Sequence, residues 1–225
     1  MGEGILSTIG NTPLVKLSRI FKDSPFELFA KLEGLNPGGS AKDRSALNIL
    51  KAAMKEGKVR PDTVIIESSS GNLGIGLAQV CCYYGLRFIC IVDPKTTQQN
   101  IQVIKAYGGE IDLVSEPDPI TGEFLQAGID RAKALLRGIK DSFWPNQYAN
   151  LANAAAHYKT TMSEIAAALN GEIDYLFCAT STCGTIRGCS EYVRDHNLRT
   201  KIFAVDAVGS LIFGGKAAKR LIPGH

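Results

Sequence analysis

A lysine follows a proline- and glycine-rich turn near the start of this 225-residue chain. The segment Asn36-Pro37-Gly38-Gly39-Ser40-Ala41-Lys42-Asp43-Arg44 comes after an expected strand and enters an expected helix, which places Lys42 near the first helical turn. The positive end of the helix dipole disfavours the charged form of a lysine there. A neutral amine is what imine chemistry requires. On residue type alone, a solvated loop lysine is the commoner case, and the neighbouring glycines do not exclude it.

A serine-rich turn offers a second polar loop between an expected strand and an expected helix. It reads Glu67-Ser68-Ser69-Ser70-Gly71-Asn72-Leu73-Gly74-Ile75-Gly76. Its successive backbone N–H groups and hydroxyls are a natural site for a carboxylate or a phosphate. Gly74 and Gly76 are expected to let the helix pack closely on the sheet. The glycine order differs from the G-x-G-x-x-G of dinucleotide-binding turns, and a serine-rich helix cap is the alternative interpretation.

The third polar loop is Ser181-Thr182-Cys183-Gly184-Thr185, between a strand ending near Ala179 and the helix that follows. Small residues and hydroxyls at a helix N-terminus are typical of phosphate cradles, although a simple helix cap explains the same residues equally well. In an open α/β sheet, ligands bind beyond the carboxyl ends of the strands, where such loops meet. The three loops can therefore converge on one anionic ligand.

The elements that must position these loops alternate along the chain. The expected strands are Thr12–Leu17, Glu27–Leu32, Val64–Glu67, Arg87–Val92, Ile111–Val114, Tyr175–Ala179 and Lys201–Asp206. The expected helices are Arg44–Gly57, Asn72–Tyr84, Gln98–Tyr107, Phe124–Arg137, Leu151–Leu169 and Thr185–His196. Strands that alternate with helices of this length predict an α/β fold with parallel sheets covered by helices on both faces.

Composition excludes several classes of function. The 25 Lys and Arg residues balance 22 Asp and Glu residues and are scattered along the chain, which argues against a nucleic-acid partner. No apolar run approaches the ~20 residues of a bilayer span, and the N-terminus lacks the features of a secretory signal, so we expect a cytoplasmic protein without a membrane partner. The six cysteines form no C-x-x-C pair and the three histidines are dispersed, which predicts reduced thiols and no metal site.

Taken together, the loops resemble the cysteine synthase family of fold-type II pyridoxal-phosphate enzymes. The matching segments are Ile9-Gly10-Asn11-Thr12-Pro13-Leu14-Val15, Lys31-Leu32-Glu33 with residues 36–44, and Ser70-Gly71-Asn72. They occur in the family's order and spacing, and the resemblance covers essentially the whole chain. It implies pyridoxal 5'-phosphate as the cofactor, the two-domain fold of the tryptophan synthase β subunit, amino-acid substrates and a homodimer.

The resemblance also implies roles for residues of the three loops. Lys42 would carry the Schiff base to the cofactor and act as the general acid and base, and Asn72 would hydrogen-bond the 3′-oxygen of the pyridoxal ring. The substrate would be bound by Ser69, Ser70, Gly71, Asn72, Gln147 and Tyr148. The cofactor phosphate would be bound by Ser181, Thr182, Cys183, Gly184 and Thr185. Cys183 stands where cysteine synthases carry a glycine, so its side chain must point away from the phosphate.

Further segments look closer to one branch, the N-(2-amino-2-carboxyethyl)-L-glutamate synthases of diaminopropionate and siderophore (staphyloferrin B) biosynthesis. These segments are Val92-Asp93-Pro94-Lys95, Asn146-Gln147-Tyr148-Ala149-Asn150, Ser181-Thr182 and residues 204–214. That branch replaces the phosphate of O-phospho-L-serine by the amine of L-glutamate. An arginine of the branch falls on Gly128 here, and Arg131 lies one turn further along. The alternatives are an O-acetylserine sulfhydrylase, or a protein that binds the cofactor or a partner without catalysis.

The resemblance divides the chain into two domains with the cofactor between them. Residues 1–45 and 150–225 are expected to form a larger, discontinuous cofactor-binding domain, and residues 46–149 a smaller substrate-binding domain. Family members continue well beyond the length of this chain, so we expect the C-terminal part of the larger domain to be missing from it.

Overall fold

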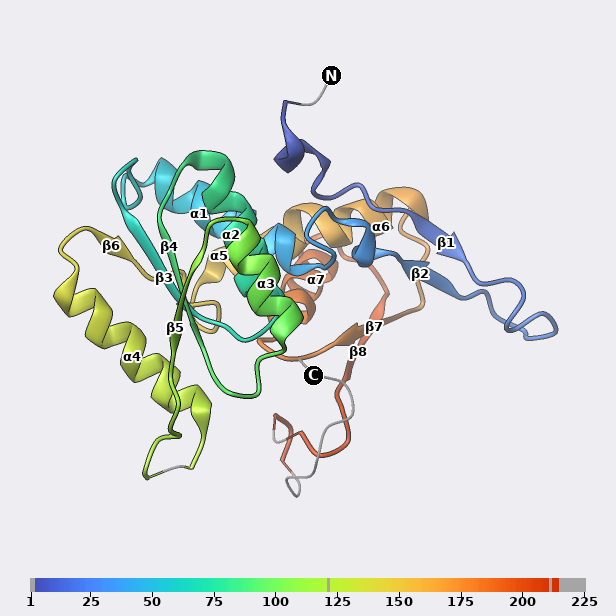
Figure 1. Ribbon diagram of the computed structural model, residues 1–225. Coiled ribbons are helices and arrows are strands. Elements are labelled where there is room, and N and C mark those ends of the chain that lie inside the picture. Colours follow the sequence, from blue (N-terminus) through green and yellow to red (C-terminus); the bar gives the residue numbers. More distant parts are fainter. Residues whose placement is uncertain (1–2, 121, 211, 215–225) are drawn as a thin grey trace.

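The computed structural model describes residues 3–120, 122–210 and 212–214. Its largest sheet is a four-stranded, all-parallel one with the order β5-β4-β3-β6 (Figure 1). The strands are β3 (Val64–Ser68), β4 (Phe88–Val92), β5 (Glu110–Leu113) and β6 (Ser142–Phe143). Ile65 pairs with Phe88, and Ile89 pairs with Glu110. The two central strands are almost continuous apolar runs because a parallel sheet is buried on both faces.

Helices cover both faces of this sheet, as the alternation of elements predicts. They are α1 (Lys42–Lys55), α2 (Asn72–Tyr84), α3 (Gln98–Ala106) and α4 (Phe124–Gly138). Val64 and Ile66 face α4, whereas Ile65 between them joins the core formed with α1, α2 and α3. Figure 1 shows α4 alone on one side of the strands. Successive side chains of one strand thus serve two separate cores, which is the two-residue period of a strand.

A second parallel pair consists of β7 (Tyr175–Ala179) and β8 (Lys201–Val205), joined through α7 (Gly184–Asp195). One face packs on α7 around Cys178 and Cys189. On the other face the aromatic rings of Tyr175, Phe177 and Phe203 are exposed, and the last two stack with centroids 5.3 Å apart. The prediction that helices cover both faces therefore fails for this pair within the described residues.

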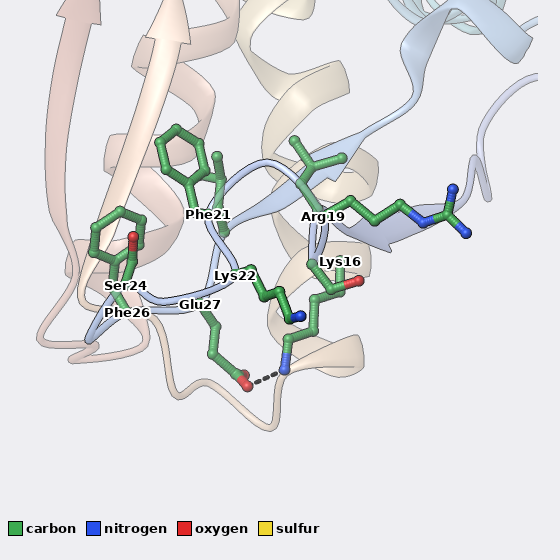
Figure 2. A pocket seen from close by; sticks show the side chains of 10 residues that line it. Lys16, Arg19, Phe21, Lys22, Ser24, Phe26 and Glu27 are labelled. Carbon is green, nitrogen blue, oxygen red and sulfur yellow. Dashed lines mark hydrogen bonds and ion pairs between the residues drawn. The ribbon is translucent and has the colours of Figure 1, made fainter.

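The two N-terminal strands form an antiparallel hairpin, which adds to the predicted parallel sheets. β1 (Leu14–Lys16) pairs with β2 (Phe29–Lys31), and the hairpin projects away from the four-stranded sheet in Figure 1. Its loop lines a pocket of about 640 Å³, where Lys16 pairs with Glu27 and the rings of Phe21 and Phe26 meet (Figure 2). None of the residues predicted for the functional site lines that pocket.

The helix predicted over residues 151–169 is interrupted. α5 (Leu151–Ala156) leads into a π-helical turn, η3 (His157–Met162), which leads into α6 (Ser163–Ala168). Two short 3₁₀ turns, η1 (Ile5–Thr8) and η2 (Glu33–Leu35), flank the hairpin. The other predicted helices and strands are present, with ends that differ by at most two residues, and β6 is an addition. Leu211 and residues 215–225, the end of the predicted larger domain, lie outside the described residues.

A buried arginine ties the N-terminal region to the helices. Arg44 in α1 donates from Nε to Glu33 at 2.7 Å and from Nη1 to Glu164 of α6 at 2.6 Å. Lys31 pairs with the same Glu164 at 2.6 Å. The Arg44 side chain is 1% exposed, so its charge is compensated almost entirely by these two carboxylates. This network fixes the start of α1, where Lys42 lies.

None of the helices among the described residues is both long enough and apolar enough to cross a bilayer. In the same part of the chain, no three His, Cys, Asp or Glu side chains gather in a way that could hold a metal ion.

Candidate active site

Lys42 is the first residue of α1, which begins two residues before the predicted start at Arg44. Its backbone N–H donates to Ser40 Oγ at 3.2 Å, and burial lowers the pKa of its amine. The prediction of a disfavoured charge thus agrees with the structure, and desolvation is the cause that the surroundings supply. The turn before it folds around Asp43, whose carboxylate accepts the Gly38 N–H at 2.6 Å. A Cβ at Gly38 would lie only 2.5 Å from that carboxylate, so the turn requires glycine there.

The serine-rich turn has one buried residue that is held by hydrogen bonds and two exposed polar residues. Ser69 is buried: its hydroxyl accepts the Gly74 N–H at 3.1 Å, and its carbonyl accepts the thiol of Cys90 at 3.2 Å. Ser70 and Asn72, by contrast, are exposed at the first turn of α2. Ser69 thus fixes the backbone of the turn, and the exposed side chains of Ser70 and Asn72 can reach a ligand.

Gly76 packs on α1 instead of on the sheet, which corrects the expectation for this glycine. A Cβ on Gly76 would lie 3.1 Å from the Cβ of Ala46 and 3.3 Å from the carbonyl oxygen of Lys42. Gly74 does face the sheet, since its Cβ would lie 3.0 Å from Cys90 Sγ. The close approach at Gly76 brings the start of α1, with Lys42, against the first turns of α2, which begins at Asn72.

The third loop enters α7 through a left-handed residue. Cys183 has φ 60° and ψ 10°, and α7 begins at Gly184. A Cβ on Gly184 would collide with the side-chain amide of Asn153, so the loop lies directly on α5. Ser181, Thr182 and Thr185 are half-buried at this helix end. The loop therefore presents hydroxyls and the positive end of a helix dipole in one place.

A single buried amide connects α1, the segment at Gln147 and the third loop. Asn153 accepts a hydrogen bond from Ser45 of α1 at 2.7 Å and donates to the Gln147 carbonyl at 2.9 Å and to the Thr182 hydroxyl at 3.2 Å. Gln147 itself is 7% exposed, whereas Tyr148 is exposed. The predicted site residues thus lie on segments that hydrogen bonds and the α1–α2 contact hold together. Asn153 was not predicted as part of this site.

Comparison with known proteins assigns the family. Residues 5–224 match the family of pyridoxal-phosphate dependent enzymes. The chain belongs to this family. It is therefore an enzyme that depends on pyridoxal phosphate, and the predicted α/β fold of fold type II is confirmed.

Solved structures of related proteins agree over the whole chain. A hydrogen sulfide-producing enzyme from Fusobacterium nucleatum is 36% identical with a TM-score of 0.90, over 100% of this chain and 72% of that one. An O-ureido-L-serine synthase is 32% identical with a TM-score of 0.89, over 100% and 69% of the two chains. An O-acetylserine dependent cystathionine beta-synthase from Helicobacter pylori is 32% identical with a TM-score of 0.88, over 100% and 72%.

The residues of this pyridoxal-phosphate enzyme fit its cofactor. The aldehyde of the cofactor needs an amine that is readily neutral, and burial lowers the pKa of Lys42. The phosphate needs hydrogen-bond donors and a positive potential, which the hydroxyls of Thr182 and Thr185 and the first turn of α7 supply. Lys42 lies on α1, and Thr182 and Thr185 lie at the start of α7; Asn153 of α5 contacts α1 through Ser45 and the loop before α7 through Thr182.

The left-handed backbone explains why glycine is usual at position 183 in the cysteine synthase family. A left-handed residue other than glycine costs about 1–2 kcal/mol. We expect Cys183→Gly to raise the free energy of unfolding by up to about 1 kcal/mol, because glycine's extra freedom in the unfolded chain offsets part of the gain. Urea unfolding followed by circular dichroism measures this. Cys183→Ala keeps the Cβ and should bring no comparable gain; equal stability of the two variants would show that the backbone is not strained.

A buried glutamate supports the serine-rich turn and was not predicted. Glu67, 1% exposed near the end of β3, accepts the Trp144 indole N–H at 3.0 Å and the Ser68 N–H at 3.0 Å. Burial raises the pKa of Glu67 to about 7, although these donors oppose the shift. Glu67 thereby connects the serine-rich turn with the segment that leads to Gln147.

The raised pKa of Glu67 predicts a pH-dependent stability. The folded protein retains the proton up to about pH 7, whereas the unfolded chain loses it near 4.5, so stability falls as the pH rises through this window. The Glu67→Gln variant has no carboxyl group at this position, so its stability lacks this pH dependence. We expect the stability of this variant relative to wild type to increase by about 3 kcal/mol between pH 4.5 and 7.5, at about 1.36 kcal/mol per pH unit.

Urea unfolding at several pH values tests this expectation. The exposed Glu116→Gln serves as the control for the loss of a carboxylate. A stability difference for Glu67→Gln that stays constant over the pH range would contradict the assignment of a raised pKa to Glu67.

The position at which the glutamate-using branch carries an arginine is closed in this enzyme. A Cβ on Gly128 of α4 would collide with Ser68 Oγ, so α4 lies against the end of β3. Arg131, one turn further along, donates instead to Asp112 of β5 at 2.7 Å, and its side chain is 46% exposed. The guanidinium is thus already engaged with a carboxylate of β5.

Proposed function

We propose that this enzyme catalyses β-replacement on O-phospho-L-serine with the amine of L-glutamate, giving N-(2-amino-2-carboxyethyl)-L-glutamate for diaminopropionate or siderophore biosynthesis. The observation that carries the β-replacement is the close packing of the Lys42 backbone on Gly76, in the helix that follows the Ser69–Asn72 turn, together with the lowered pKa of the half-buried Lys42 amine. Proton transfer at the α-carbon of an amino acid requires an amine that can lose its proton and a group nearby that holds the substrate carboxylate. The choice of substrates is supported by the segments at 92–95, 146–150 and 204–214 that resemble that branch.

The residues of the chain take the following roles in this proposal. When bound, pyridoxal phosphate supplies an electron sink that acidifies the α-carbon of the attached amino acid. Lys42 holds the cofactor through its Nζ and then takes and returns the α-proton at that atom. Asn72 donates to the 3′-oxygen of the cofactor ring from its exposed position on α2. The substrate is bound by Ser69, Ser70, Gly71, Asn72, Gln147 and Tyr148. The phosphate is bound by Ser181, Thr182, Cys183, Gly184 and Thr185, with Cys183 contributing its backbone.

We further propose that residues 46–149 close as a smaller domain over a larger one built from residues 1–45 and 150–225. The helix α1 would be shared, because it runs through residue 45 and packs against both α2 and α5. Closure would exclude water from the reacting groups. A homodimer and a cytoplasmic location complete the proposal; the free state of Cys81, Cys82, Cys90, Cys178, Cys183 and Cys189 is compatible with a reducing compartment.

One observation favours a second candidate function. Gly128 lies against Ser68 at the position of the branch arginine, so that cation is absent beside the serine-rich turn. An O-acetylserine sulfhydrylase, with acetate leaving and sulfide attacking, does not depend on it. One of the similar proteins is an O-acetylserine dependent enzyme.

Separate addition of the two serine esters to the purified holoenzyme distinguishes the candidates. We expect O-phospho-L-serine to change the visible absorption of the bound cofactor, and mass spectrometry to detect N-(2-amino-2-carboxyethyl)-L-glutamate once L-glutamate is added. A response to O-acetyl-L-serine alone, with cysteine formed from sulfide, would establish the sulfhydrylase instead. Bound cofactor that responds to neither ester would indicate a binding protein without this activity.

A further inference from the structure

The orientation of the Asn153 side chain is fixed by its neighbours. The Gln147 carbonyl lies 2.9 Å from Nδ2 and can only accept a hydrogen bond, so the amide nitrogen must face it. The second proton of Nδ2 then points to Thr182 Oγ1 at 3.2 Å, and Oδ1 accepts the hydroxyl of Ser45 at 2.7 Å. Asn153 is 3% exposed, and all its hydrogen-bonding groups have partners. It follows that Asn153 is a donor toward Thr182.

The tautomer of His157 follows from the same assignment of hydrogen-bond donors and acceptors. His157 Nε2 lies 3.2 Å from both Ser45 Oγ and Thr185 Oγ1, and Nδ1 lies 2.9 Å from Thr161 Oγ1. Ser45 has given its only proton to Asn153, so it must accept one from Nε2. Burial lowers the pKa of His157 to about 4, which keeps the ring neutral, and Nδ1 therefore accepts from Thr161. The Nε2 proton is thus shared between Ser45 and Thr185.

Thr182 accordingly accepts a hydrogen bond from Asn153, and Thr185 accepts one from His157. A hydroxyl that accepts one keeps its own proton for another acceptor. The start of α7 packs closely on α5 and η3, because a Cβ on Gly188 would collide with the Ala154 carbonyl and a Cβ on Gly184 with Asn153. The π-helical turn that begins at His157 offers this ring to α7. Such turns are frequent at functional sites.

We propose that Asn153 and His157 are positioning residues that direct the hydroxyl protons of Thr182 and Thr185 toward the cofactor phosphate. They contact neither the phosphate nor the substrate; they convert two groups that can donate or accept into obligate donors. This inference rests on the proposed role of the 181–185 loop. The oxygens of the cofactor phosphate only accept hydrogen bonds, and both threonine hydroxyls would then donate to them. Hydrogen bonds to a charged group are stronger than those between neutral groups.

The experiment compares two ligands that differ only in the phosphate. The protein is freed of cofactor with hydroxylamine and titrated with pyridoxal 5'-phosphate and with pyridoxal. The dissociation constant of pyridoxal divided by that of pyridoxal 5'-phosphate is the ratio that measures recognition of the phosphate. Asn153→Asp has the same shape but replaces the donor by a second acceptor. We expect it to reduce the ratio by about tenfold or more, the effect of losing one hydrogen bond to a charged group. Asn48→Asp is the matched control, because Asn48 donates to the Ala152 carbonyl at 2.6 Å without touching the loop.

Two further pairs of variants protect the test against a simple failure to fold. His157→Gln retains an N–H near the position of Nε2 and should keep more of the ratio than His157→Phe. Thr182→Val and Thr185→Val remove the hydroxyls themselves. If the threonine variants lower the ratio but Asn153→Asp and His157→Phe leave it unchanged, the positioning role is wrong and the phosphate site stands. If the threonine variants also leave it unchanged, the phosphate does not bind at this loop.

Discussion

Replacement of Lys42 by alanine should remove the covalent attachment of pyridoxal phosphate and lower kcat by about a thousandfold or more. The expected size follows from the loss of a general acid and base, which alone contributes about 10²–10⁴-fold. Lys42 is distinguished from the other lysines of α1 by its burial, which lowers the pKa of its amine and makes the neutral form accessible. Borohydride reduction followed by intact-mass measurement reports the attachment, and turnover of the serine ester reports kcat.

Lys51 supplies the matched control for this experiment, because it lies on the same helix and is exposed. Lys51→Ala should keep both the cofactor mass increment and the turnover. Circular dichroism establishes that Lys42→Ala is folded. A folded Lys42→Ala protein that still gains the mass of the reduced cofactor would place the attachment on another lysine.

Replacement of Arg44 by alanine should lower the free energy of unfolding by about 3–5 kcal/mol, the cost of breaking a buried ion pair by removing one partner. Arg44 is 1% exposed, and its loss would leave Glu33 and Glu164 beside each other without their shared cation. The present pairing lowers the pKa of Glu164 to about 2, mainly through the Arg44 hydrogen bonds against an opposing effect of burial. Urea unfolding at neutral pH measures the loss.

A second arginine–glutamate pair on the surface provides the comparison. Arg87 binds Glu110 at 2.6 Å, but both side chains are about half exposed, at 55% and 51%. Arg87→Ala should therefore cost no more than about 1 kcal/mol. Equal effects of the two substitutions would mean that burial does not strengthen the Arg44 network. A quadruple variant that also replaces Lys31, Glu33 and Glu164 by apolar residues should recover part of the stability, since no charge of the network is then left unpaired.

The sequence predicts the fold where burial is uniform. The apolar runs of β3 and β4 identify the centre of a parallel sheet, and the helices between them follow from their periodicity. β6 escaped prediction because it has only two residues and depends on pairing with β3. The π-helical turn at His157 interrupts a continuous helical pattern, so local sequence gives no sign of it. The antiparallel pairing of β1 with β2 likewise depends on contacts that the alternation of elements does not reveal.

The loops of the candidate site were predicted, but the residues behind them were not. Lys42 and Asn72 follow glycine-containing turns, which are visible locally. Asn153 and Glu67 act through partners far along the chain, since Asn153 binds Ser45 across 108 positions and Glu67 binds Trp144 across 77. One signal was present: Asn153 and His157 lie four residues apart on a helix rich in alanine, where two polar side chains on one buried face need partners.

The contact between Trp144 and Glu67 equips this protein with an optical reporter. Trp144 is the only tryptophan of the chain, and its indole N–H donates to the buried carboxyl group of Glu67, the first residue of the serine-rich turn. All tryptophan emission of the molecule therefore originates beside the loop that the proposal assigns to the amino-acid carboxylate. Ligand binding at that loop can be followed by fluorescence on the unlabelled protein.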